Sequence, residues 1–349
     1  MQFSYNRFYE QPQRQNGSKE RWVKMVYNTQ PSEEMAQAFS LLSAVRTQIE
    51  SVVIGKSQAV RFALVAYLAK GHVLLEDLPG TGKTTLTKTI ARTLGLGFKR
   101  IQFTPDLMPS DITGMSYYNT QSGEFVFRPG PVFTNILLAD EINRTTPRTQ
   151  SALLEAMEEQ QVTMEGITKP LPQPFFVMAT QNPIDTEGTF PLPSAQQDRF
   201  LLKIRLGYPS RTDEAEIVRR HAFSSPIDAL TPILTEEQAL FLRETAAGVY
   251  LDDSLVDYIL DIIEASRNRD EFGLALSSRS SLAMVRAAKA LALIEGRAFV
   301  LPDDIKALAV PVFGHRLMLK KAETYKGKSA EDLLVQMIAE IPLVFKGDA

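Results

Sequence analysis

The segment Leu75–Thr85 constrains the fold of this chain more than any other. It reads LEDLPGTGKTT, follows the apolar run His72–Leu75 and precedes residues that favour a helix. Two glycines allow backbone N–H groups to curl around an anion, and the lysine and hydroxyl side chains that follow would face it from the start of the helix. The segment therefore predicts a strand, a phosphate-binding loop and a helix in succession, as in α/β proteins.

Each residue of this loop has an expected contact. The predicted nucleotide-binding residues of the loop are Pro79, Gly80, Thr81, Gly82, Lys83, Thr84 and Thr85. Lys83 would neutralise the β- and γ-phosphates of ATP, and the Thr84 hydroxyl would bind Mg²⁺. The usual pattern starts with glycine, whereas this chain has Asp77. We expect this departure to be tolerated, because that position begins the loop and does not itself wrap the phosphate. An ordinary Gly-Thr-Gly turn with a chance lysine is the alternative interpretation.

A second motif is an apolar run that ends in two acids. Ile136–Ala139 is followed directly by Asp140 and Glu141. Asp140 can hold Mg²⁺ through water, as nucleotide hydrolases with this loop require. Glu141 can accept a proton from the attacking water, which is the role of a general base. An apolar strand that ends in two acids is common by itself, but its place after a phosphate-binding loop favours hydrolysis over the chemistry of a kinase.

Five short apolar runs alternate with helical stretches in the first part of the chain. They are His72–Leu75, Lys99–Phe103, Ile136–Ala139, Phe175–Ala179 and Leu201–Leu206. Such runs predict a parallel five-stranded sheet with helices on both faces. From Thr212 on the pattern is helical throughout, and Thr235 with Gln238 predicts a capping box. We therefore expect an αβα sandwich of the phosphate-loop NTPase type, followed by an all-helical C-terminal domain.

The length of 349 residues predicts more than one domain. Residues 1–33 are polar and rich in Asn and Gln, which predicts a flexible extension. Met25 is an alternative start of translation, in which case residues 1–24 are not native. We assign residues 34–208 to the nucleotide-binding core with two hairpin inserts, and residues 209–349 to a helical lid domain, because Gly and Pro residues break the pattern between them.

Composition excludes several classes of function. The net charge is −3, so no strongly basic domain indicates nucleic-acid binding. The chain has no cysteine, and its three histidines stand far apart, which argues against disulfides and against a zinc site. No apolar run approaches the roughly 18 residues of a membrane span. Residues 1–33 lack the apolar stretch of a signal peptide, so we expect a cytoplasmic location.

Four segments together resemble the MoxR-type AAA+ ATPases in order and spacing. They are QFTPDLMPSDITGMSYYNTQSGEFVFRPG, ADEINRTTPRTQSALLEAMEEQQVT, ATQNPIDTEGTFPLPSAQQDRF and SSRSSLAMVRAAKALALIEGR. The resemblance extends over roughly residues 34–340. It departs from the family at Gln197, where leucine is usual. The fold that the resemblance implies is an AAA+ core with a helical lid.

The resemblance implies roles for the residues of both motifs. Lys83 and Thr84 would form Walker A, and Asp140 and Glu141 would form Walker B. Asn182 would be the first sensor, which orients the lytic water. By its sequence alone, Asn182 before a proline would be an ordinary turn opener.

Two arginines and one glycine segment receive roles from the same resemblance. Arg199 would be an arginine finger acting on the ATP of a neighbouring subunit, where such a residue can be worth ~10³–10⁵ in rate. Its alternative is a surface ion pair with Asp198. Arg279 would be a second sensor contacting the γ-phosphate from the lid; the alternative is a solvated charge at a helix start, where a cation opposes the helix dipole. Ile54 and Gly55 would lie on the adenine side, or simply end a helix.

Two further segments predict β-hairpins. Tyr117–Phe127 has strand-forming residues around Ser122-Gly123, and Val162–Leu171 has them around Glu165-Gly166. The resemblance implies inserts that project from the core and contact a partner, whereas surface hairpins without function are the alternative. A nucleic-acid motor would need basic hairpins, but these two segments contain one basic residue, Lys169.

The function implied is ATP-driven remodelling of a partner protein, including its activation or the insertion of a metal. A ring, expected to be a homo-hexamer, follows from Arg199 because that residue has no use in the site of its own subunit. Family analogy suggests partners with von Willebrand factor A domains. The alternatives are a magnesium-chelatase-like motor subunit, a nucleic-acid-associated AAA+ motor and a nucleotide-dependent switch with negligible turnover.

Overall fold

The computed structural model describes residues 31–183, 188–221, 226–325 and 327–344. Nearly all of the predicted N-terminal extension lies outside these residues. By contacts, one compact unit runs from Ser40 to Glu244, and the other combines the described residues up to Phe39 with those from Thr245 on. This division lies further along the chain than the predicted boundary at residues 208 and 209, so the predicted domain assignment stays a prediction.

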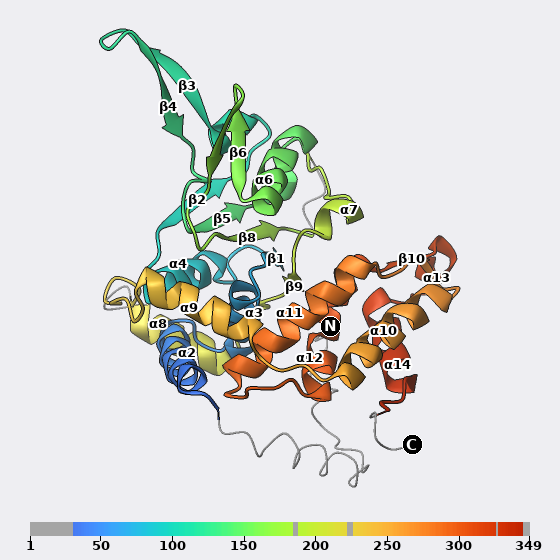
Figure 1. The fold of residues 1–349 in the computed structure, drawn as a ribbon. Coiled ribbons are helices and arrows are strands. Elements are labelled where there is room, and N and C mark those ends of the chain that lie inside the picture. Colours follow the sequence, from blue (N-terminus) through green and yellow to red (C-terminus); the bar gives the residue numbers. More distant parts are fainter. Residues whose placement is uncertain (1–30, 184–187, 222–225, 326, 345–349) are drawn as a thin grey trace. The chain divides into compact units, whose positions relative to one another are not determined.

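The first unit is built on a five-stranded parallel sheet (Figure 1). Its strands are β1 (Val73–Glu76), β2 (Phe98–Gln102), β5 (Ile136–Asp140), β8 (Phe176–Gln181) and β9 (Leu202–Ile204), in the order β2-β5-β8-β1-β9. All five predicted runs form these strands. Because the strands are parallel, the residues that follow β1, β5 and β8 lie at one edge of the sheet.

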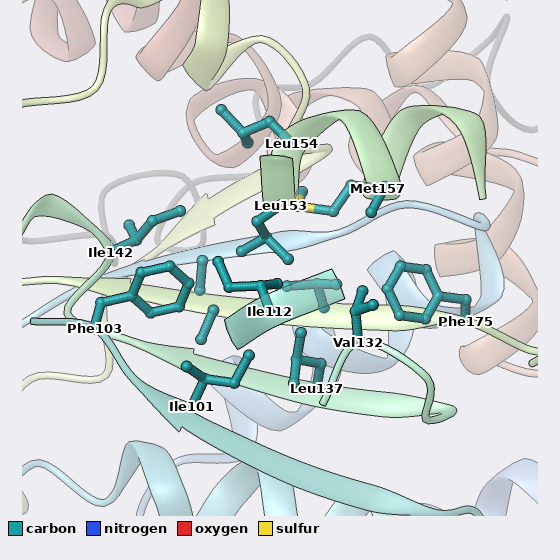
Figure 2. Close-up of a cluster of buried hydrophobic side chains, with 14 of the residues drawn as sticks. Ile101, Phe103, Ile112, Val132, Leu137, Ile142, Leu153, Leu154, Met157 and Phe175 are labelled. Carbon is teal, nitrogen blue, oxygen red and sulfur yellow. The ribbon is translucent and has the colours of Figure 1, made fainter. Parts of the chain in front are cut away.

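Helices cover the sheet because its central strands β5, β8 and β1 are apolar on both faces, whereas the edge strand β2 has exposed polar residues; β5 is buried along its whole length. The bounds are α2 (Glu33–Val52), α3 (Ser57–Leu68), α4 (Lys83–Thr93), α5 (Pro109–Thr113), η2 (Ile142–Arg144), α6 (Pro147–Glu159), α7 (Ser194–Gln197), α8 (Arg211–His221) and α9 (Glu236–Ala247). Pro147 begins α6 as predicted, at a position where the missing N–H breaks no helical hydrogen bond. Leu153, Leu154 and Met157 of α6 belong to the core cluster over β2, β5 and β8 (Figure 2).

Two hairpins extend from this unit, as the sequence predicts. β3 (Gly114–Asn119) pairs with β4 (Glu124–Pro129), and β6 (Gln161–Met164) pairs with β7 (Ile167–Pro170). The second turn consists of Glu165 and Gly166, both with positive φ, which suits the twist of a two-residue hairpin loop. The β3–β4 hairpin reaches far beyond the sheet (Figure 1).

The predicted capping box before α9 is also present. The Thr235 backbone N–H donates to Gln238 Oε1 at 3.0 Å, and the Gln238 N–H donates to Thr235 Oγ1 at 3.2 Å. These two bonds satisfy N–H groups that have no partner inside the helix.

The second unit is helical, with one correction to the prediction. Its elements are α10 (Asp253–Asn268), β10 (Phe272–Leu274), α11 (Ser278–Ile294), α12 (Pro302–Phe313), η3 (Gly314–Arg316), β11 (Met318–Leu319), α13 (Lys321–Tyr325) and α14 (Ala330–Glu340). β10 and β11 form a small antiparallel pair, so this region is not helical throughout. Strands of two and three residues are too short to give a period in the sequence. A search of the described residues finds no helix that could span a membrane.

Candidate functional site

The loop after β1 has the backbone that phosphate binding requires. Gly80 and Gly82 have φ values of 81° and 93°, a region that L side chains rarely adopt, and a Cβ built on either would meet nothing within 4 Å. Backbone conformation and not crowding therefore demands these glycines. Gly82 is the N-cap of α4, so the positive end of the helix dipole faces the loop.

Lys83 and Thr84 occupy the first turn of α4. The Lys83 ammonium donates to the carbonyl oxygens of Asp77 at 2.9 Å and Leu78 at 3.2 Å, so it is folded back over the loop. Thr81 closes the same turn by donating its hydroxyl to Leu78 O at 3.1 Å. The loop thus holds its own cation in place through two neutral carbonyl groups and not through a carboxylate.

Asp77 anchors the loop, a role that sequence reasoning missed. Its carboxylate accepts hydrogen bonds from the N–H groups of Leu206 and Gly207, the latter at 2.9 Å. Lys56 donates to the carbonyls of the same two residues at 2.9 and 2.7 Å. Burial lowers the pKa of Lys56, and the negative charges of Asp77 and Asp213 oppose that shift. The aspartate therefore fastens the start of the loop to the segment after β9, which glycine could not do.

Gly55 is required by close packing. It has a φ of 71°, and a Cβ there would lie 2.4 Å from the Asp213 carboxylate of α8. This is a structural reason for glycine, and the adenine-side roles of Ile54 and Gly55 stay predictions.

The two acids that follow the apolar run are held by a polar network. Thr180 of β8 donates its hydroxyl to Asp140 Oδ1 at 2.7 Å and accepts the Glu141 N–H at 2.8 Å. Glu141 has a φ of 58°, which turns its side chain out of the strand direction. Its carboxylate accepts from Gln102 at 2.7 Å and lies 3.2 Å from the Arg144 guanidinium.

Thr180 and Gln102 were missed by sequence reasoning. Their signal was positional, since each stands at the carboxyl end of a strand next to β5. Strand order is needed to use that signal, because neither residue is near Asp140 in the sequence.

A second charged group lies where β1 and β9 end. Glu76 accepts from Gln181 at 2.8 Å and pairs with Lys203 at 2.8 Å and Arg205 at 2.9 Å. Burial raises the pKa of Glu76, but the two cations outweigh burial and lower it overall. This cluster holds β1, β8 and β9 together directly before the phosphate loop.

Asn182 directly follows β8, at the sheet edge that also carries Asp140. Its backbone carbonyl accepts a hydrogen bond from the Asn143 side chain at 3.4 Å. The buried Oδ1 of Asn143 has no hydrogen-bond partner within the described part of the chain. Asn182 is therefore placed beside the segment that carries the two acids.

Arg199 follows α7 and pairs with Glu158 of α6 at 2.8 Å. The alternative from the sequence named Asp198, so the ion-pair partner differs from that expectation. The Arg199 side chain keeps 29% of its surface exposed and lines a hollow of about 630 Å³ together with Glu155 and Glu159. Gln197, at the departure from the family pattern, donates to Leu192 O at 2.9 Å.

Arg279 is exposed in the first turn of α11, in the second compact unit. Ser277 caps this helix in a box with Ser280. The sensor role of Arg279 stays a prediction.

Comparison with known proteins gives consistent matches. Residues 72–202 match the ATPase family associated with various cellular activities (AAA), and residues 264–336 match the AAA lid domain. The chain is 48% identical to the uncharacterized protein YeaC of Bacillus subtilis, over 86% of this chain and 94% of that protein. It is 44% identical to chaperone MoxR1 of Mycobacterium tuberculosis, over 82% of this chain and 78% of the relative.

A crystal structure agrees with these matches. A protein of Cytophaga hutchinsonii that is assigned as an ATPase superimposes with a TM-score of 0.85 and 35% identity, over 93% of this chain and all of that one. The sheet, the phosphate-binding loop, the acids after β5 and these matches together lead to one conclusion: the chain belongs to the MoxR-type AAA+ ATPase family.

Proposed function

We propose that this protein binds ATP with Mg²⁺ and hydrolyses it to remodel a partner protein. One observation carries the proposal: Thr180 of β8 connects β1, which leads into the phosphate-binding loop, with β5, which ends at Asp140. Its backbone is in register with Leu75 of β1, and its hydroxyl bonds Asp140 of β5. The phosphate-binding loop and the two acids therefore converge on one sheet edge, where ligands of open α/β sheets bind.

The residues present fit ATP and Mg²⁺. The glycine backbone and the helix N-terminus suit phosphate oxygens, and Lys83 supplies positive charge for them. Thr84 and Asp140 offer the hydroxyl and carboxylate oxygens that magnesium prefers. When bound, the metal would neutralise charge that develops on the transferred phosphoryl group.

Catalysis would then rest on two side chains at this edge. Glu141 would accept the proton of the attacking water. Gln102 positions the Glu141 carboxylate through a hydrogen bond. Asn182 would orient that water from the end of β8.

Arg199 would complete the site of a neighbouring subunit in a ring, expected to be a hexamer. In its own chain it is bonded to α6 and not to the phosphate loop, which supports a role in trans. An arginine that keeps 29% of its side-chain surface exposed next to acids is suited to exchange its partner for a phosphate of another subunit.

The hairpins would contact the remodelled partner. Tyr118 and Phe125 of the β3–β4 hairpin are 54% and 74% exposed, and Ile167 extends from the other hairpin at 61%. Lys169 lies over the Phe127 ring at 4.9 Å and joins the two hairpins. Exposed aromatic side chains favour a protein partner over nucleic acid. A partner with a von Willebrand factor A domain, and a cytoplasmic location, are proposed by family analogy.

The test is nucleotide affinity in Lys83→Ala, measured by calorimetric titration with ATP and Mg²⁺. We expect binding to be lost, because the β/γ charge loses its nearest loop cation. Lys88→Ala is the matched control, since Lys88 lies on the same helix beyond its first turn and should leave affinity unchanged. Near-normal affinity in Lys83→Ala would overturn the phosphate-loop proposal.

A further inference from the structure

Arg100 of β2 is a charged side chain that the proposed function leaves without a role. Its Nη2 donates to Asp140 Oδ2 at 2.6 Å, and its Nε donates to the same oxygen at 3.2 Å. The contact crosses the β2–β5 pair, in which Gln102 is in register with Asp140. A guanidinium therefore sits on the carboxylate that is proposed to serve magnesium.

The carboxylate of Asp140 has little room for a further donor or cation. Oδ1 accepts the Thr180 hydroxyl at 2.7 Å, and Oδ2 accepts both N–H groups of Arg100. A carboxylate offers about four lone-pair sites, so three are occupied. A second cation at the same oxygen would also be repelled by the guanidinium, which is always charged.

The two members of the pair differ in exposure to solvent. The Asp140 side chain keeps 12% of its surface exposed, whereas that of Arg100 keeps 47%. Asp140 is also fixed by Thr180, so of the two it is Arg100 that can swing into solvent at small cost. If the pair separates, we therefore expect Arg100 to move and Asp140 to stay in place.

Gln102 steadies Arg100 in this position. The Nη2 of Arg100 donates to Gln102 Oε1 at 2.9 Å, while the Gln102 amide donates to Glu141 at 2.7 Å. One guanidinium is therefore linked to both acids, directly to Asp140 and through Gln102 to Glu141.

We propose that Arg100 is the internal counter-ion of Asp140, which it neutralises in the metal-free protein and releases when magnesium binds. Arg100 then sets the metal concentration at which the site fills, by competing for Asp140. The inference rests on the proposed function, since it assumes that Asp140 serves the metal. Arg100 is a positioning residue in this scheme, because it acts through Asp140.

The test measures metal affinity without turnover. A fluorescent ADP analogue is titrated against the protein at a series of Mg²⁺ concentrations, and the concentration that gives half of the metal-dependent gain in affinity is compared. Arg100→Gln should need about threefold to tenfold less Mg²⁺, the size of a half-exposed charge-assisted pair. Electron paramagnetic resonance with Mn²⁺ gives an independent readout of the same shift.

Three further variants sharpen the result. Lys99→Gln removes the same charge from the neighbouring position of β2, which faces away, and should leave the metal dependence unchanged. Arg100→Lys keeps a charge but cannot make both contacts to Asp140, so it should give an intermediate shift; it also serves if Arg100→Gln is unstable. Gln102→Ala should shift the curve in the same direction by a smaller factor.

The outcomes separate the two proposals. A metal dependence that Arg100→Gln leaves unchanged, or moves to higher Mg²⁺, overturns the counter-ion role while the proposed function stands. Nucleotide affinity that is independent of Mg²⁺ in the unaltered protein overturns the proposed magnesium site, and the counter-ion role with it.

Discussion

The edge of the sheet where β1, β5 and β8 end and the β3–β4 hairpin hold their side chains in opposite ways. At the edge, Asp77 and Asp140 are buried, and groups distant in the sequence bond them: backbone N–H groups after β9 bond Asp77, and the Arg100 guanidinium of β2 bonds Asp140. On the hairpin, Phe125 is mostly exposed and contacts Tyr118 of its own partner strand, with ring centroids 5.4 Å apart. Polar groups removed from water must be bonded, whereas exposed aromatic rings need no partner inside the chain. The difference teaches that the polar residues proposed for catalysis are held by several bonds from distant segments, whereas the residues proposed for partner contact leave apolar surface exposed to solvent.

The largest expected effect tests whether one chain contains all the residues that the proposed catalytic site at the strand ends needs. Arg199→Ala should bind nucleotide normally but lose ~10³–10⁵ in rate, because charge on the transferred phosphoryl group loses its stabilising cation. Glu141→Gln should lose ~10²–10⁴. Mixed together, the two inactive proteins should regain phosphate release, since some interfaces then pair an intact Glu141 with an intact Arg199.

The control for this mixture is Glu158→Gln, which frees Arg199 from its ion pair but keeps the arginine. It should reduce the rate far less than Arg199→Ala. No rescue on mixing, together with a rate per chain that does not change on dilution, would show that Arg199 acts in its own chain or not at all.

A smaller effect, on the free energy of unfolding, is expected from Asp77, which anchors the phosphate-binding loop. Asp77→Ala should lower the free energy of unfolding by about 1–3 kcal/mol, because the N–H groups of Leu206 and Gly207 lose their acceptor. Lys56 would also lose a neighbouring negative charge. Urea unfolding measures the change, and Asp77→Asn, which keeps one acceptor, should lose less. A value within about 0.5 kcal/mol of the unaltered protein would contradict the anchoring role.

The smallest effect on stability is expected on the hairpin. Phe125→Ser should change the free energy of unfolding by no more than about 0.5 kcal/mol, because the ring is mostly in solvent already. Basal ATP hydrolysis should also be unaffected, while stimulation by, or binding to, the partner should weaken. Phe103→Ser is the contrasting variant, since that ring is fully buried in the core and its loss should destabilise strongly. If Phe125→Ser were as unstable as Phe103→Ser, the claim that the hairpin ring contributes little to folding would be contradicted.

The sequence alone located the parts that depend on neighbouring residues. Five apolar runs became the five strands, the residues of the capping box bonded as expected, and both hairpins formed around their predicted turns. In each case the information lies within a few residues, because periodicity, turn chemistry and capping act over one or two turns of chain. β10 and β11 escaped detection because they are shorter than any such period.

Tertiary structure alone decided which distant side chains meet. Arg100 contacts Asp140, Asp77 bonds the segment after β9, and Arg199 pairs with Glu158 instead of its neighbour Asp198. Each of these contacts joins residues about 40 to 130 positions apart, across strands or between helices. Their formation depends on the strand order β2-β5-β8-β1-β9 and on register, which brings the end of one strand beside that of another. Local sequence preferences do not determine that order. The candidate residues of the site could therefore be predicted from the sequence, whereas the hydrogen bonds and ion pairs that hold them could not.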